Sequence, residues 1–103
     1  MKGFGDLQKM LKNAQEMQEK LQRELSELRV EGSSGGGMVT VVLDGQKNLH
    51  SVRLEPEVVS REDVTMLQDL IVAAFNDASA KANDIVARRL GGLGAGLKLP
   101  GMS

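Results

Sequence analysis

Few side chains in this sequence could carry out catalysis. His50 is the only histidine, and there is no cysteine. A metal site needs several such ligands, and His50 has no second histidine or cysteine to complete a set. It lies in a stretch that alternates with Val52 and Leu54, where a lone histidine is more often structural than a base. We therefore expect neither a metal ion nor a cofactor.

Two other groups of residues invite a catalytic interpretation but have simpler ones. The first is a group of carboxylates around a proline and a predicted helix start: Glu55, Glu57, Glu62 and Asp63. Capping and the helix dipole favour negative charge there. The second is the glycine-rich run over residues 91–96, which is similar to a phosphate-binding loop. A dinucleotide fingerprint follows a strand and opens a helix, whereas this run follows a predicted helix. We predict no enzymatic activity and no small-molecule substrate.

The residues before position 29 predict one long amphipathic helix, from residue 6 to residue 28. Apolar side chains recur there at steps of three and four that follow a coiled-coil heptad seam: Leu7, Met10, Ala14, Met17, Leu21 and Leu28. Leu11 and Leu25 widen this stripe, so it can pack against more than one neighbour. At 1.5 Å a residue the helix is a rod of roughly 35 Å.

The middle of the chain predicts a small antiparallel sheet. The helical period is lost over residues 29–37, whose glycines and serines indicate a loop or an irregular edge strand. Residues 38–43 and 49–55 then predict two strands of a hairpin, joined by a turn over residues 44–48. We expect two to three strands in all, ended by Pro56.

A second long helix is predicted after the strands. Ser60 is a good N-cap for it, and the helix runs to about Leu90. Several alanines between residues 73 and 82 make one stretch narrow, so another helix could approach closely. Residues 91–103 form a glycine-rich tail that we expect to be mobile. The prediction is an α+β fold, with a single helix–sheet–helix domain over residues 1–90.

A chain of this kind gains from pairing with a second copy. Aromatic residues make up only 2% of the 103 residues, and two or three strands with free edges are marginal alone. We therefore expect a homodimer. The residues assigned to its interface or to helix packing are Met17, Leu21, Val41, Ile71, Ala74, Asn76 and Ala78.

The sequence offers no sign of a membrane or export segment. No apolar run approaches the roughly 20 residues that a transmembrane helix needs. The first residues also lack the apolar stretch of a signal peptide. We expect a soluble cytoplasmic protein that does not contact a membrane.

Charge is segregated along the chain although its sum is only −1. Both ends are basic and residues 44–77 are acidic. If the two helices pack antiparallel beyond the sheet, both basic segments meet at one tip that could neutralise DNA phosphates. The residues expected to contact double-stranded DNA are Lys2, Lys9, Lys12, Lys81, Arg88 and Arg89. The alternative is that the arginines complement a helix C-terminus and the lysines solubilise the rod.

Four stretches, in order, resemble one known family. Residues 14–21 (AQEMQEKL) look like its first-helix segment, and Glu31-Gly32 with the glycine run and residues 38–41 (MVTV) are similar to its strand region. Residues 67–78 (LQDLIVAAFNDA) follow its most specific signature, and residues 96–100 (GLKLP) fit its tail. The sequence thus resembles the YbaB/EbfC family of bacterial nucleoid-associated proteins.

The resemblance implies a tweezers-like homodimer that binds and compacts duplex DNA in the nucleoid and influences gene expression. It implies that the protruding helices contact DNA. Within the signature, we interpret Asn76 and Asp77 as packing residues, with Asn76 bonded to the backbone.

One alternative of another class stays open, a prefoldin-like interaction or chaperone module. Such proteins also place a hairpin between two heptad helices and hold clients at the arm tips. Apolar residues near the ends favour it: Phe4, Leu7, Leu11, Leu93 and Leu97.

Overall fold

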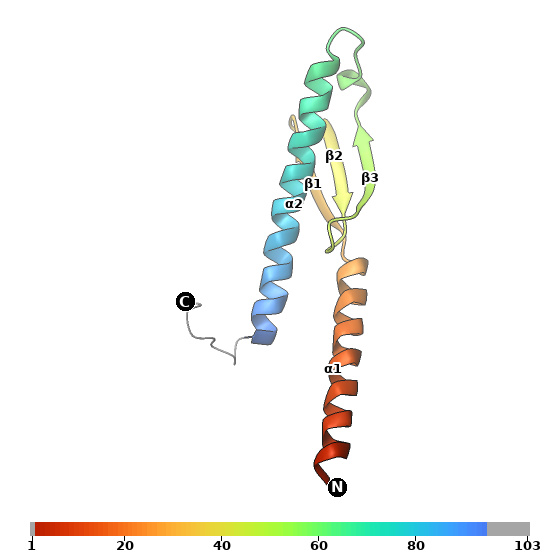
Figure 1. The fold of residues 1–103 in the computed structure, drawn as a ribbon. Helices are drawn as coiled ribbons and strands as arrows, with labels where there is room; N and C mark the ends of the chain where they lie inside the picture. Colours follow the sequence, from red (N-terminus) through yellow and green to blue (C-terminus); the bar gives the residue numbers. More distant parts are fainter. Residues whose placement is uncertain (1, 95–103) are drawn as a thin grey trace.

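The computed structural model describes residues 2–94, and the side chains of residues 3–91. The chain is elongated, measuring 74 × 28 × 16 Å, and its elements follow the predicted order of helix, three strands and helix (Figure 1). The bounds are α1 Lys2–Glu27, β1 Val30–Ser34, β2 Val39–Leu43, β3 Leu49–Leu54, a short 3₁₀ helix η1 Pro56–Val58 and α2 Val64–Gly94. The predicted α+β class is confirmed. Within residues 2–94, no helix is long and apolar enough to cross a membrane.

The three strands form one antiparallel sheet in the order β1-β2-β3. Val41 in the middle of β2 pairs with Gly32 on β1 and Val52 on β3. Directly paired residues point to the same face, so these three share the face on which α2 lies. The core forms there, from Val39, Val41, Leu43, Val58, Ala74 and Ala78.

The narrow alanine stretch of α2 packs on a strand, so the expectation of a second helix against it is wrong. A Cβ atom on Gly32 would lie 2.6 Å from the carbonyl oxygen of Ala74 and 2.5 Å from the Cβ of Ala78. Ser34 Oγ also donates a hydrogen bond to the carbonyl of Leu70, at 2.6 Å. Small residues on both sides let the helix and β1 approach closely.

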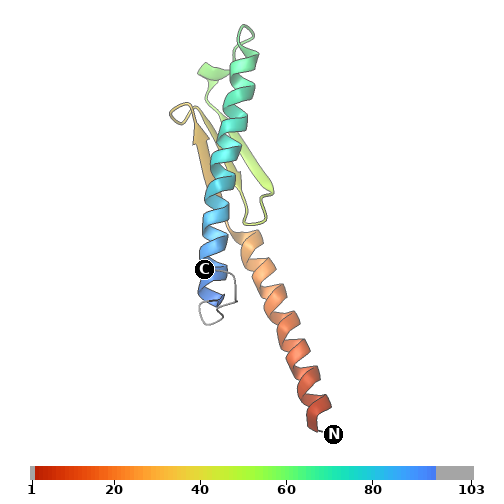
Figure 2. The ribbon, with the colours of Figure 1, turned by 60° about the vertical axis from the view of Figure 1, so that its left-hand side comes forward.

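In contrast, α1 leaves the body as a free rod. Every side chain from residue 3 to residue 20 is exposed, and the apolar side chains at its far end, Leu21, Leu25 and Leu28, are half-covered. The N–H of Gly45, in the β2–β3 turn, donates to the carbonyl of Leu25 at 2.8 Å and anchors this end. Figures 1 and 2 both show α1 continuing well past the end of α2.

The element boundaries differ from the predicted ones in three places. First, α1 begins at Lys2, four residues early, and includes Gly3 and Gly5. Second, Asp63 caps α2, since its Oδ1 accepts the N–H of Met66 at 3.1 Å. Ser60 instead accepts the N–H of Glu62 in the preceding turn, at 3.2 Å, so the predicted cap is wrong.

The third difference is that α2 continues through residues 91–94, past its predicted end at about Leu90. The rest of the expected mobile tail, residues 95–103, lies outside the described residues.

Candidate nucleic-acid interface

The basic residues of the two helices do not meet at one tip. Arg89 on α2 lies beside the inner half of α1, with its Nη1 3.9 Å from Glu24 Oε2. At 1.5 Å a residue, Lys12 lies about 18 Å and Lys9 about 22 Å further along α1. The prediction of a single basic tip is therefore wrong. The reason is that α2 begins at the end of the body farthest from α1 and runs along the sheet before it reaches the level of α1 (Figure 1).

The structure thus separates two basic regions. The arm region consists of Lys9 and Lys12, both exposed on α1. The helix-end region consists of Arg88 and Arg89, both exposed on α2. Lys2 opens α1, but its side chain lies outside the described part of the chain.

Lys81 is less available than the other predicted contacts. Its Nζ lies 2.9 Å from Asp77 Oδ2, one helical turn away. The same oxygen accepts the N–H of Ser33 at 3.0 Å. The hydrogen bond from Ser33, and then the hydrogen bond from Lys81, hold the pKa of Asp77 below its usual range. Lys81 therefore supports an internal contact as well as facing solvent.

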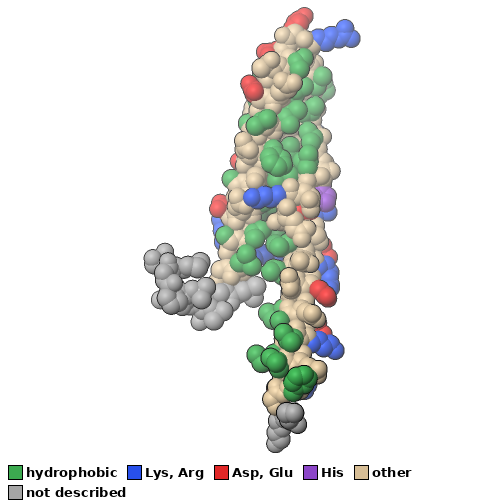
Figure 3. Space-filling view, in the orientation of Figure 1, with side chains coloured by type: hydrophobic (Ala, Val, Ile, Leu, Met, Phe, Trp, Pro, Cys, Tyr) green, Lys and Arg blue, Asp and Glu red, His purple; other side chains and the backbone are tan. Residues whose placement is uncertain are grey.

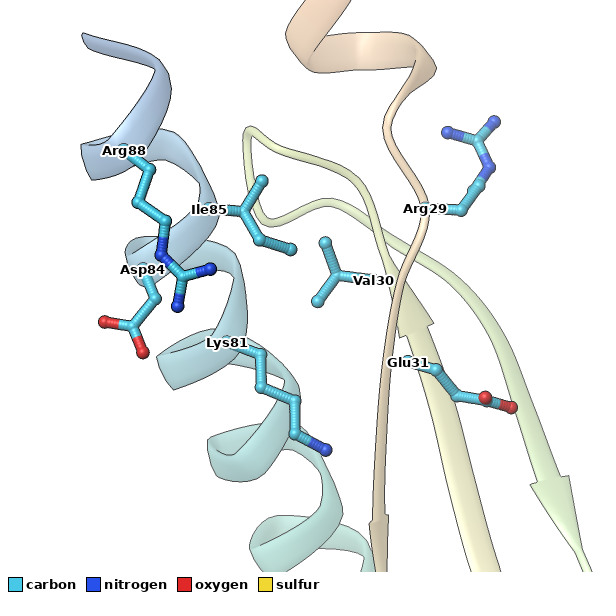
Figure 4. Close-up of a pocket in the computed structure, with 7 residues that line it drawn as sticks. All are labelled: Arg29, Val30, Glu31, Lys81, Asp84, Ile85 and Arg88. Atoms are coloured by element: carbon cyan, nitrogen blue, oxygen red, sulfur yellow. The ribbon is translucent and has the colours of Figure 1, made fainter. Parts of the chain in front are cut away.

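A surface cavity of about 270 Å³ lies between the end of α2 and β1. Its lining combines three cations, two carboxylates and two apolar side chains: Arg29, Val30, Glu31, Lys81, Asp84, Ile85 and Arg88. Figure 4 shows Lys81, Asp84, Ile85 and Arg88 on α2 across from Val30, whereas the guanidinium of Arg29 points away from α2. The carboxylates offset much of the positive charge, so the cavity is a mixed surface.

Arg29 is a cation that the sequence did not single out. Its Nη1 donates to the carbonyls of Ser26 and Leu28, at 2.8 and 2.9 Å. These carbonyls lie at the C-terminal end of α1, where a positive charge is favoured. Its position directly after a predicted helix was the available signal.

His50 has a structural role at the β2–β3 turn. Its Nε2 lies 2.9 Å from Oδ2 of the buried Asp44. The pKa of Asp44 lies well below its ordinary value, first because of this hydrogen bond and then because of bonds from Asn48 and Gln46. His50 itself is exposed, in a register shift where Val42 pairs with Ser51 and Leu43 with Leu49. The sequence did not predict Asp44 as the partner of His50.

The predicted packing residues divide into two groups. Val41, Ala74 and Ala78 are buried in the core of the chain itself, and Ile71 is half-buried against it. Leu21 is half-covered, while Met17 is 62% exposed. Asn76 is also exposed. The side chain that bonds to the backbone is that of Asp77, whose Oδ2 accepts the N–H of Ser33.

An apolar surface lies beside this core. Because α2 packs mainly on β1 and β2, the same face of β3 is left open, and Val52 is 42% exposed although its partner Val41 is buried. We name the α2–β3 face by its exposed apolar residues: Leu49, Val52, Val64, Val72 and Phe75. Figure 3 shows apolar side chains gathered between these two elements.

Comparison with known proteins agrees with this architecture. The model of the YbaB/EbfC DNA-binding family matches residues 2–97. The chain belongs to this family. A nucleoid-associated protein of Pelotomaculum thermopropionicum is 44% identical over 101 residues, which cover 95% of this chain and 96% of that protein. Another, of Macrococcus caseolyticus, is 55% identical over 74 residues, 72% of this chain and 70% of its own.

A solved structure is similar in fold to this YbaB/EbfC chain. It is an uncharacterized protein from Helicobacter pylori, with a TM-score of 0.73, 21% identity, and coverage of 87% of this chain and 95% of its own. The stretch over residues 67–78 that carries the family resemblance lies on α2, against the sheet.

Proposed function

We propose that this YbaB/EbfC chain binds double-stranded DNA in the nucleoid of the bacterial cytoplasm, acting as a homodimer and altering the conformation of the DNA. The family and the names of its relatives support DNA as the partner. The observation that carries the proposal is the free arm, because α1 stands clear of the body and exposes Lys9 and Lys12 near its tip. The acidic group that begins at Glu55 lies at the opposite end of the molecule (Figure 1).

The two basic regions suggest how the duplex is held. Measured along the axis of α1, they lie about 20 Å apart, compared with about 34 Å for a full turn of DNA. One chain can therefore contact phosphates at two separate places. Such contacts position a protein without reading sequence. A duplex held at several points by two rods must follow their shape, which is the basis for a change in its conformation.

The α2–β3 face supports the homodimer. A three-stranded sheet with an exposed apolar face is marginal by itself, and a second copy would cover Val52, Val72 and Phe75 by a symmetrical contact. Such a dimer presents two free arms. Two arms on one particle raise the affinity for DNA, because the second binds at a high effective concentration.

The experiment is a gel shift with two unrelated duplexes across a salt series. We expect binding to both duplexes and a steep loss of affinity as salt rises. Each lost phosphate contact should lower the slope of log K against log salt by about 0.9. Lys9→Ala with Lys12→Ala should reduce the slope, as should Arg88→Ala with Arg89→Ala. Arg61→Ala, at the acidic end, is the control. Failure to retain either duplex at low salt would contradict the proposal.

One observation favours a second function, the prefoldin-like module. Phe4, Leu7 and Leu11 are 64%, 52% and 59% exposed on the arm, and exposed apolar surface can hold an unfolded client. An aggregation assay with a denatured client tests it. Protection at stoichiometric amounts, with no DNA retention at low salt, would replace the DNA-binding proposal by this one.

A further inference from the structure

The outer part of the apolar stripe of α1, from Phe4 to Met17, is not covered by the body. On the described chain, Phe4, Leu7, Met10, Leu11 and Met17 are all more than half exposed. The ten such side chains of two copies together expose on the order of 1,000 Å², the size at which specific protein interfaces begin. An exposed apolar surface of this extent marks an interaction site, and a heptad stripe is the surface by which one helix packs on another.

The sequence of α1 is complementary to itself when reversed about Ala14. Reversal places Leu7 opposite Leu21, seven residues to either side, and both lie within about 20° of Ala14 on the helix surface at 100° a residue. It also brings Met10 to within one residue of the level of Met17, on the same border of the stripe. The small Ala14 falls at the crossing point, where it lets two helix axes approach to about 8 Å.

Charge also favours the antiparallel arrangement. Along the border of the stripe, reversal brings Asp6 near Lys20, an opposite pair. It also brings Lys9 and Lys12 to the level of Glu19 and Glu16 of the other helix. A parallel pair would instead place the two basic tips together, and like charges at close range repel.

We propose that α1 pairs antiparallel with α1 of a second copy, centred on Ala14. In this pair the two bodies lie at opposite ends of the joined rods, so their α2–β3 faces stay free. Lys9 and Lys12 lie on the side of α1 opposite Ala14 and still face solvent. The pairing itself does not depend on DNA binding.

Two different symmetrical contacts on one chain link copies into an open series. The α2–β3 contact would join bodies and the α1 contact would join arms, so the assembly does not close into a single dimer. Together with the proposed DNA binding, on which this consequence rests, the arm contact would tie DNA-bound dimers to each other. Bridging of separate duplex segments is the result.

The natural absence of cysteine allows a direct test by engineered disulfides. In the proposed pair, the Cα atoms of the two copies of residue 14 lie within about 6 Å, inside disulfide range. Those of residues 7 and 21 on opposite copies are also close. Two copies of residue 7, in contrast, are about 21 Å apart and cannot join.

We expect Ala14→Cys to cross-link into a dimer under mild oxidation on a non-reducing gel. A mixture of Leu7→Cys and Leu21→Cys should cross-link, whereas Leu7→Cys alone should not. Lys12→Cys, on the opposite side of the helix, is the matched control, and circular dichroism checks that each variant is folded. Cross-linking of Leu7→Cys alone would show a parallel pair and overturn the proposal.

If Ala14→Cys cross-links no more than the Lys12→Cys control, the proposed arm pairing is also overturned. The apolar stripe of α1 would then bind a client protein or another segment of the chain. The gel shift with the unmodified protein separates these outcomes from DNA binding. If the duplexes are retained but the cysteine mixture does not join, the arm pairing is wrong and the proposed function stands. If the mixture cross-links but neither duplex is retained, the arm pairing stands and the proposed DNA binding is wrong.

Discussion

The carboxylate of Asp77 on α2 accepts the backbone N–H of Ser33 on β1 at 3.0 Å, across 44 positions of the sequence. This N–H lies at the outer edge of the sheet, where an unpaired strand can recruit another chain. Lys81 Nζ lies 2.9 Å from the same carboxylate oxygen. One acidic side chain thus joins the helix to the strand and pairs one N–H of that edge.

Asp77→Ala should lower the thermal stability by several degrees, because it leaves the Ser33 N–H without its acceptor and Lys81 without its partner. Asp77→Asn keeps an acceptor oxygen and should have a smaller effect. Thermal unfolding followed by circular dichroism measures both. Asp84→Ala, an exposed acidic residue two turns further along α2, is the control. Equal midpoints for Asp77→Ala and the control would show that the contact is dispensable.

The contact between Asp44 and His50 predicts a dependence of stability on acid. The pKa of Asp44 in the folded chain lies below its ordinary value of 3.8. This depressed pKa contributes stability that is present above the ordinary value and is lost as pH falls below it. Urea unfolding at a series of pH values should therefore show a fall in the free energy of unfolding below about pH 4.

Asp44→Asn is the matched variant for this pH series. It removes the titrating group, so it should be less stable than the parent at neutral pH and its stability should change less in acid. His50→Ala should bring the pKa of Asp44 back toward its ordinary value, which NMR titration of the carboxyl can follow. Parallel pH profiles for the parent chain and Asp44→Asn would contradict the assignment.

The sequence predicted the elements well and their relative placement poorly. Heptad steps and strand alternation identified both helices and the hairpin, because these patterns depend on local periodicity. Periodicity does not say how far one helix extends beside another. The two basic segments were therefore expected to meet at one tip, whereas Arg89 in fact lies beside Glu24. The length of α2 that packs on the sheet decides where the C-terminal end of α2 lies beside α1.

The same limit applies to the polar contacts. Ser60 and Asp63 both suit a helix cap, and the turn between them decides which one caps. Asp77 and Asn76 are adjacent, and the direction of α2 over β1 selects Asp77. Contacts that join residues far apart in the sequence depend on the packed fold, which a single sequence shows only indirectly.

Gly32→Ala should destabilise the fold by about 1–3 kcal/mol, the usual cost of overpacking. An added Cβ would overlap the backbone of α2 at Ala74 and Ala78. Gly91→Ala is the control, because its Cβ would meet nothing within 4 Å. It should raise helix stability, by up to about 1 kcal/mol. Urea unfolding of both variants measures the difference, and a neutral Gly32→Ala would mean that α2 can move off the strand.

Phe75→Lys should shift the proposed dimer toward monomer. Phe75 lies on the α2–β3 face with 36% of its surface exposed, and burying a lysine there without a partner is costly. Asn83→Lys adds the same charge at another exposed position of α2 and is the control. Sedimentation at micromolar concentration should show a lighter species for Phe75→Lys alone.

The loss of the dimer should also weaken the gel shift, although Phe75→Lys adds a positive charge. The reason is that a monomer presents a single arm, so the gain in affinity from a second linked contact disappears. Charge alone would change DNA binding in the opposite direction, which separates the two effects. A folded Phe75→Lys variant that sediments like the parent chain would place the dimer contact on another surface.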